Sequence, residues 1–248
     1  MTERGTREGI GEHPFVLLDL FCCAGGAGEG YRREGFDVVG VDIQPQPRNP
    51  HTFHECDAVE FLEEFGHDFD LIHASPPCQQ HTALRGRTGK TYRCYINEVR
   101  AILETLSVPW VIENVPGAPL RNPVTLCGTM FGLGAQGHEL QRHRLFESSF
   151  PIAQPECQHT EKPVIGVYGG HARNRSAKHG GRGTADAWHG GHKAAASEAM
   201  GIDWMSMNEI SQAIPPAYTQ HVAREFLKQN AAISPHGEHG LVSEASGE

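Results

Sequence analysis

The chain has 248 residues, of which 38% are apolar and 21% charged, with 29 glycines and 16 prolines. These values are typical of a folded protein with many loops, and they exclude a largely disordered chain. No run approaches the roughly 18 apolar residues of a membrane span, and the N-terminus has no apolar signal core. We therefore expect a cytoplasmic protein without a membrane partner.

The net charge of -9 and the seven cysteines bear on the class of protein and on its partners. The cysteines are scattered and form no Cys-x-x-Cys pair, which favours reduced thiols over a disulfide framework or a ribbon-type zinc site. The negative charge argues weakly against a nucleic-acid partner, because Lys and Arg drive phosphate binding. Residues 85–100 and 171–193, however, each carry five basic residues against one acid. These two stretches are either solvated surface or phosphate contacts.

Strand-like and helix-like segments alternate along the first half of the chain. The apolar run at 15–21 predicts a buried strand, followed by a Gly-rich turn and a helix. The runs at 37–43, 69–74 and 110–115 predict three more strands, and 97–106 predicts a helix. This alternation predicts an α/β fold with a parallel sheet, in which ligands bind at the carboxyl ends of the strands.

Changes in composition suggest the domain boundaries. Residues 1–13 and 231–248 lack periodicity, and we expect flexible tails there. The alternating segments fill 14–150, whereas 151–199 are rich in Gly, His and basic residues and indicate a small inserted lobe. Residues 200–230 contain an amphipathic helix after a Pro-Pro pair, and we expect this segment to return to the main sheet.

The first two strands end in a pattern that suits a nucleotide-type cofactor. Gly25, Gly26 and Gly28 would let the backbone approach a ligand closely. Asp42, about twenty residues further on at a strand end, is placed to accept hydrogen bonds from ribose hydroxyls. Asp57 could receive an exocyclic amine. Taken singly, either aspartate could instead cap a turn or a helix.

Four further residues could carry chemistry. Cys78 follows two prolines at a strand end, either as a small buried residue or as an exposed nucleophile that reacts as a thiolate. Glu113 ends a very apolar strand, where burial would raise its pKa and let it act as an acid. Arg142 and Arg144 would share one face of a strand, suited to a phosphate clamp or a surface ion pair.

The order of these pieces resembles the DNA (cytosine-5)-methyltransferase family across residues 15–227. The motifs are "DLFCCAGGAGEGY", "VVGVDI", "CDA", "ASPPCQ", "WVIENVP", "RHRLF" and "SQAIPPAY", of which "PPCQ" and "ENV" are the most specific. The resemblance implies a Rossmann-like S-adenosylmethionine-dependent methyltransferase fold. In that fold 14–150 would form the catalytic and cofactor-binding domain, 151–199 a small target-recognition lobe, and 200–230 would pack beside the cofactor.

The resemblance also implies S-adenosylmethionine as the cofactor, with Asp42 at the ribose, Ile43 against the adenine and Asp57 at the adenine amine. Cys23 stands where the family has glycine, and Ser211-Gln212 stand where it has Gly-Asn. The full set of expected cofactor-binding residues is Phe21, Cys23, Ala24, Gly25, Gly26, Asp42, Ile43, Asp57, Pro76 and Gln212.

The implied catalytic residues are Cys78, Glu113, Arg142 and Arg144. By the resemblance, Cys78 attacks carbon 6 of cytosine, Glu113 binds and protonates ring nitrogen 3, and the two arginines hold the target nucleotide. The substrate would be duplex DNA with the cytosine flipped out, because carbon 6 is shielded in a stacked base. We expect the protein to act as a monomer.

Three alternatives remain at this stage. A tRNA cytosine-5 methyltransferase would carry similar motifs. An inactive nucleic-acid-binding homologue would explain the departures at Cys23 and Ser211-Gln212. A metal site is a third alternative, using lobe residues that fit no standard zinc spacing, and we therefore expect no metal. Those lobe residues are Cys157, His159, His171, His179, His189 and His192.

Overall fold

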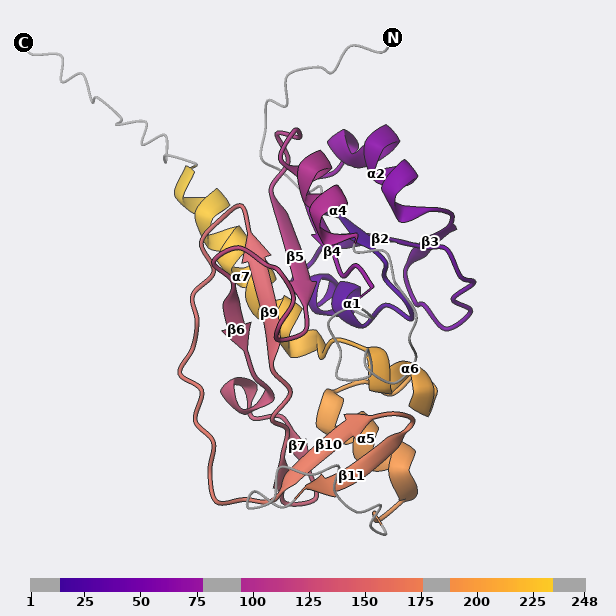
Figure 1. The fold of residues 1–248 in the computed structure, drawn as a ribbon, viewed down its shortest axis with the longest axis vertical. Helices are drawn as coiled ribbons and strands as arrows, with labels where there is room; N and C mark the ends of the chain where they lie inside the picture. The colour runs from indigo at the N-terminus through magenta and orange to yellow at the C-terminus, as the bar shows by residue number, and fades with distance from the viewer. Residues whose placement is uncertain (1–13, 78–94, 176–187, 234–248) are drawn as a thin grey trace, which may run out of the picture.

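The computed structural model describes residues 14–77, 95–175 and 188–233 (Figure 1). Cys78, His179, most of the basic stretch at 85–100 and nearly all of the two expected tails lie outside these ranges. Within them, no helix is both long and apolar enough to cross a membrane.

The main sheet has seven strands in the order β3-β2-β1-β4-β5-β9-β6. The first five are parallel, as the alternating pattern predicts, but β9 runs antiparallel to both β5 and β6. The prediction of a wholly parallel sheet is therefore wrong at this edge, because a parallel neighbour of β5 would need a helical crossover. The strands are β1 (Val16–Leu20), β2 (Asp37–Asp42), β3 (Thr52–Glu55), β4 (Leu71–Ala74), β5 (Trp110–Asn114), β6 (Val124–Leu126) and β9 (Arg144–Ser148).

Helices cover both faces of the main sheet, which explains why its central strands read as continuous apolar runs. Along β1, Leu17 packs into the core under α1 and α7, and the next residue, Leu18, packs into the core under α2 and α4. The predicted helix at 97–106 is confirmed as α4, with slightly earlier limits. These helices are α1 (Gly26–Arg32), α2 (Ala58–Phe65), which continues into the 3₁₀ turn η1 (Gly66–Asp68), α4 (Ile96–Leu103) and α7 (Pro216–Ile233).

The C-terminal helix α7 returns to the main sheet by crossing α1 at a glycine. A Cβ atom at Gly30 would lie 2.0 Å from Thr219 Oγ1 and 2.2 Å from the Pro216 carbonyl oxygen, so no larger residue fits there. The Thr219 hydroxyl donates to the carbonyl of Ala27 at 2.7 Å. The start of α7 is thereby fixed against α1, the helix that follows the Gly-rich turn.

A second, four-stranded sheet in the order β11-β10-β8-β7 lies at the carboxyl ends of the parallel strands (Figure 1). Its core includes Ile165 and Val167 of β10 and Ala195 and Met200 of α5. The sheet joins strands from both sides of residue 150, and the domain limits given above stay a prediction. Its elements are β7 (Gly134–Ala135), β8 (His138–Glu139), β10 (Val164–Tyr168), β11 (His171–Arg175), α5 (Gly191–Met200) and α6 (Met207–Gln212), with the 3₁₀ turn η2 (Gly128–Phe131) before β7.

A buried ion pair joins α4 to β9. Arg100 is 2% exposed, and its Nε and Nη2 donate to the two carboxylate oxygens of Glu147, each at 2.7 Å. Its remaining nitrogen donates to Asn97 Oδ1 at 2.8 Å. Arg100 therefore cannot belong to a phosphate-binding surface. The suggestion that residues 85–100 are solvated or contact phosphate is thus wrong for Arg100.

Candidate active site

The loop after β1 is held in an unusual backbone conformation. Phe21 and Cys23 have φ angles of 57° and 46°, a left-handed region that non-glycine residues rarely occupy, and Gly25 follows with φ of 80°. The Asn49 side chain donates to the Cys23 carbonyl at 3.0 Å, and the Cys23 N–H donates to Asp42 Oδ2 at 3.0 Å. The loop is thus fixed in shape at the end of the central strand.

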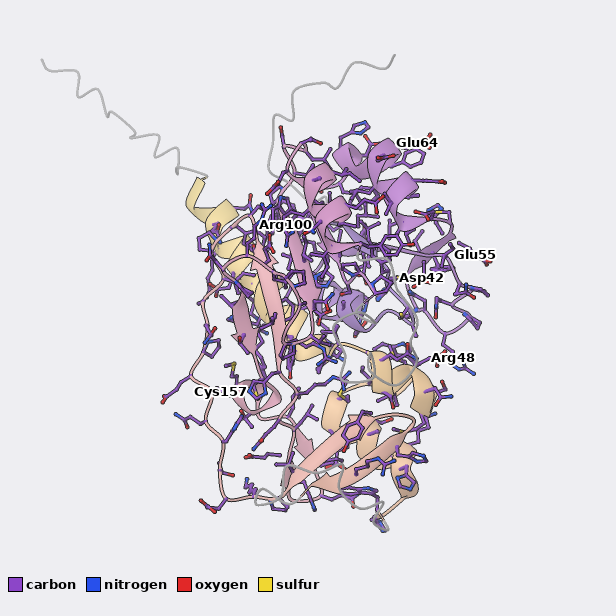
Figure 2. All side chains as sticks on the ribbon, viewed as in Figure 1. Asp42, Arg48, Glu55, Glu64, Arg100 and Cys157 are labelled. Carbon is purple, nitrogen blue, oxygen red and sulfur yellow. The ribbon has the colours of Figure 1, made fainter. Side chains whose placement is uncertain are left out.

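Two of the expected cofactor residues lie side by side at the end of β2. Asp42 is buried, and its Oδ1 accepts from the Gln44 N–H at 2.9 Å, so each carboxylate oxygen has one backbone donor. The neighbouring Ile43 leaves 62% of its side chain exposed. Figure 2 shows Asp42 on the side of the main sheet that faces the second sheet. An acid beside an exposed apolar side chain suits a ribose with an attached planar base.

Asp57 has a structural task in addition to its expected one. Its Oδ1 accepts from the backbone N–H groups of Val59 at 2.8 Å and Glu60 at 3.3 Å, which caps α2. The backbone N–H of the preceding residue, Cys56, donates to the carbonyl of Asp42 at 3.1 Å. Asp57 therefore lies close to the end of β2, and its contact with an adenine amine stays a prediction.

A carboxyl group that the motifs did not single out lies beneath the loop. Asp19 is fully buried in β1, and its Oδ2 accepts from the Gly28 N–H at 3.0 Å, while Oδ1 has no hydrogen-bond partner among the described residues. Burial, together with the negative charges of Asp42 and Glu113, raises the pKa of Asp19 to about 7. Three acidic side chains near one another make this end of the sheet favourable for a cation.

We expect the substitution Asp19→Asn to flatten the pH dependence of stability. The pKa of this carboxyl rises from 3.8 to about 7 on folding. Between these values the folded chain holds a proton that the unfolded chain has lost, so the free energy of unfolding falls as the pH rises, by roughly 4 kcal/mol in total. Urea denaturation of both proteins at about pH 5 and pH 8 should show roughly 3 kcal/mol of this change, because about two pH units of the range lie above pH 5.

The exposed Asp37, at the start of β2, provides the matched control. Asp37→Asn should leave the pH dependence of the wild type in place. An Asp19→Asn variant that loses stability between the two pH values as steeply as the wild type would contradict the assignment.

Glu113, the residue expected to act as an acid, is buried beside an arginine. It is 4% exposed at the end of β5, and its Oε1 lies 3.2 Å from Arg144 Nε. Burial raises the pKa of Glu113, although the charges of Arg144 and Arg142 and a hydrogen bond from Ser75 act in the opposite direction. The direction agrees with the expectation for a carboxyl at the end of an apolar strand, and the role of Glu113 as a proton donor stays a prediction.

The chain that leads to Cys78 is anchored beside Glu113. The Asn114 side chain donates to the carbonyl of Pro76 at 3.0 Å, and its own Oδ1 accepts from the Val115 N–H at 3.0 Å. The Ser75 N–H donates to the Leu20 carbonyl at 3.1 Å. Cys78 itself lies outside the described residues, but the chain enters its segment at the carboxyl ends of β1 and β5.

The two arginines do not share a strand face, because β9 begins only at Arg144. Arg144 pairs with Glu113, whereas the Arg142 guanidinium donates to the carbonyls of Val167 at 2.6 Å, Ser211 at 3.0 Å and Ala213 at 3.1 Å. Arg142 therefore joins β10 to the end of α6. Its expected contact with the target nucleotide stays a prediction.

The remaining expected cofactor residues lie on the loop after β1 and at the end of α6. Ala24 is buried, and its carbonyl accepts from Trp204 Nε1 at 3.0 Å. Gly26 packs so closely on the C-terminal segment that a Cβ atom there would lie 2.8 Å from the Ile214 carbonyl oxygen. Gln212 is exposed at the last position of α6. Its side chain is thus available for a ligand near the Gly-rich turn.

Comparison with solved structures defines the class of fold. A candidate DNA modification methyltransferase encoded within an E. coli prophage aligns over 88% of this chain and 99% of its own, with a TM-score of 0.56 and 14% identity. The methyltransferase EhMeth of Entamoeba histolytica aligns over 88% and 99%, with a TM-score of 0.57 and 8% identity. The chain therefore has the Rossmann-like methyltransferase fold that the motifs predict.

Sequence comparison is more specific. The type II methyltransferase M.AgeI of Thalassovita gelatinovora is 28% identical over 118 residues, covering 40% of this chain and 28% of its own. The DNA (cytosine-5-)-methyltransferase M.ApeKI of Aeropyrum pernix is 30% identical over 141 residues, covering 44% and 30%. The matches thus span less than a third of each relative, and no family model matches the chain. The chain is similar in sequence to DNA (cytosine-5)-methyltransferases, in agreement with the resemblance drawn from its motifs.

Proposed function

We propose that this protein transfers a methyl group from S-adenosylmethionine to carbon 5 of cytosine in duplex DNA, as a monomer in the cytoplasm. The observation that carries the proposal is the buried Glu113, which is paired with Arg144 at 3.2 Å and lies beside the chain leading to Cys78. An acid with a raised pKa beside a nucleophile is what addition to a pyrimidine ring requires. The names of the two curated relatives support the choice of base and nucleic acid.

The loop after β1 and the end of β2 fit the cofactor. S-adenosylmethionine supplies an electrophilic methyl group on a positively charged sulfur. The buried Asp19 carboxyl, with Oδ1 unpartnered among the described residues, and the neighbouring acids favour such a cation. Asp42 would accept hydrogen bonds from the ribose, and the exposed Ile43 would pack on the adenine. We infer that Phe21, Cys23, Ala24, Gly25 and Gly26 form the loop around it.

The chemistry on the base follows from Cys78 and Glu113. Carbon 5 of cytosine is a poor nucleophile, and thiolate addition to carbon 6 turns it into the carbon of an enamine. Glu113 gives a proton to ring nitrogen 3, which removes the negative charge that develops in the ring. After methylation carbon 5 loses its proton and the thiolate leaves, so Cys78 is regenerated. Flipping the base out of the duplex costs a few kcal/mol, which protein contacts offset.

Methyl incorporation from tritiated S-adenosylmethionine into duplex DNA and into tRNA tests the proposal. We expect label in DNA and none in tRNA, and bisulfite sequencing of DNA from expressing cells should place it on cytosines in a defined context. Label in tRNA alone would assign the tRNA alternative instead. Cofactor binding without incorporation into either substrate would identify an inactive homologue and overturn the proposal.

A further inference from the structure

Two cysteines and two histidines meet at the far edge of the main sheet, away from the Gly-rich turn. Cys127 immediately precedes η2, His143 lies just before β9, and Cys157 and His159 lie on the connection between β9 and β10. One ligand atom from each residue, a sulfur or an imidazole nitrogen, lies within 4.8 Å of all the others. Four soft donors without a carboxylate are a typical set for zinc.

The distances match a tetrahedral ion. Cys157 Sγ lies 3.2 Å from His159 Nε2 and 3.7 Å from His143 Nε2, and Cys127 Sγ lies 3.5 Å from His159 Nε2. Zinc bound at about 2.3 Å from sulfur and about 2.05 Å from nitrogen holds such ligands about 3.5 Å apart. Hydrogen bonds between neutral thiols and imidazoles would not by themselves bring four side chains from three segments to one point, because thiols are weak donors.

Donors around Cys127 support a metal-bound thiolate. The Thr129 hydroxyl donates to Cys127 Sγ at 3.3 Å, and the backbone of Thr129 also makes a hydrogen bond to this sulfur. Groups that donate to a ligand atom in this way orient it and stabilise its negative charge. The buried Cys127 would thus be the preformed half of the site, and Cys157 and His159 are exposed residues that close it.

We propose that Cys127, His143, Cys157 and His159 bind one zinc ion in a closed structural site. Four protein ligands leave no position for substrate, so the ion would act as a cross-link rather than a catalyst. It would fasten residues 149–163, which form no helix or strand, to the edge strand β6 and to the residue before β9. Figure 2 shows Cys157 on this outer connection, beside η2.

The expectation of no metal rested on a different set of residues. Cys157 and His159 were considered together with histidines of the lobe, but His171 and His192 face each other at 5.4 Å between ring centroids and lie outside the cluster. The actual partners, Cys127 and His143, belong to segments before residue 150. The set spans 33 positions with irregular spacing, so no motif reveals it.

The test is the metal content of the untagged full chain, purified without chelator. We expect about one zinc per chain by mass spectrometry of the element, and Cys157→Ser or His159→Ala should remove it. His159→Cys should retain zinc, because three thiolates and one imidazole also form a standard site. Cys56→Ser and His67→Ala, which change a cysteine and a histidine outside the cluster, should not alter the metal content.

Cobalt provides a second, spectroscopic measurement. After zinc removal, cobalt(II) should give the visible bands of a tetrahedral ion and a thiolate charge-transfer band, and both should be absent in Cys157→Ser. A wild-type chain that purifies without zinc and gives no such bands would overturn the proposal. So would a Cys127–Cys157 disulfide, seen as a mass lower by two hydrogens and as a cross-linked peptide after digestion, or zinc that persists in both ligand variants.

A consequence for the arginines rests on the proposed function. His143 stands between Arg142 and Arg144, so a metal bond to its ring would restrict the segment that presents both guanidinium groups. Zinc removal should then reduce methyl transfer as well. The metal content and the cobalt spectrum do not depend on that activity, so failure of the methylation assay would leave this proposal intact.

Discussion

Replacement of Cys78 by alanine is expected to abolish methyl transfer, with a fall in rate of roughly 10⁴-fold or more, because carbon 5 stays unreactive without a thiolate on carbon 6. Binding of S-adenosylmethionine should change by less than about twofold, since Cys78 is not among the residues expected to hold it. A tritiated-methyl assay measures the first quantity and calorimetry measures the second. Retained turnover in the variant would contradict the assignment of the nucleophile.

DNA containing 5-fluorocytosine at the target position offers a complementary result. Fluorine cannot leave as the carbon-5 proton does, so the wild-type protein should remain covalently bound to the DNA after methylation. Cys78→Ala should form no adduct, whereas Cys56→Ser, a half-buried cysteine outside the site, should form as much as the wild type. An adduct that forms equally with Cys78→Ala would assign the bond to another residue.

The parts of this fold that the sequence could predict are those with a local signal. Central strands buried on both faces must be apolar throughout, and the runs at 15–21, 37–43, 69–74 and 110–115 all correspond to strands. Glu113 could be identified because a carboxyl at the end of such a run must be desolvated. The loop after β1 could be predicted because it is rich in glycine.

The features that were missed depend on contacts between distant segments. Strands β7 and β8 have two residues each, too few to show any periodicity, and they pair only because β10 lies beside β8. Arg142 could not be distinguished from Arg144 by spacing, yet it donates to carbonyls some 70 positions further along the chain. Asp19 did have a signal, a single acid within the apolar run at 15–21, but that run was interpreted only as a strand.

Charge links Asp19, beneath the loop after β1, to Glu113. Asp19 and Glu113 lie on strands separated only by β4, and the negative charge of Glu113 helps to raise the pKa of Asp19. A cation bound near Asp19 would relieve this repulsion. Cofactor binding and the protonation of Glu113 are therefore expected to depend on each other, through charge rather than through movement of the chain.

Glu113→Gln is expected to slow methyl transfer by roughly 10²- to 10⁴-fold, because the amide keeps the shape of the side chain but cannot give a proton to ring nitrogen 3. The loss should depend on pH. Burial raises the pKa of Glu113, and the carboxyl is the active, protonated form below that value. As the pH rises through the pKa of Glu113, the wild type loses the proton that it donates. The ratio of the wild-type rate to the Glu113→Gln rate therefore falls. Glu64→Gln, an exposed change on α2, is the control that should keep the wild-type rate. A rate ratio for Glu113→Gln near one at low pH would remove Glu113 from the chemical step.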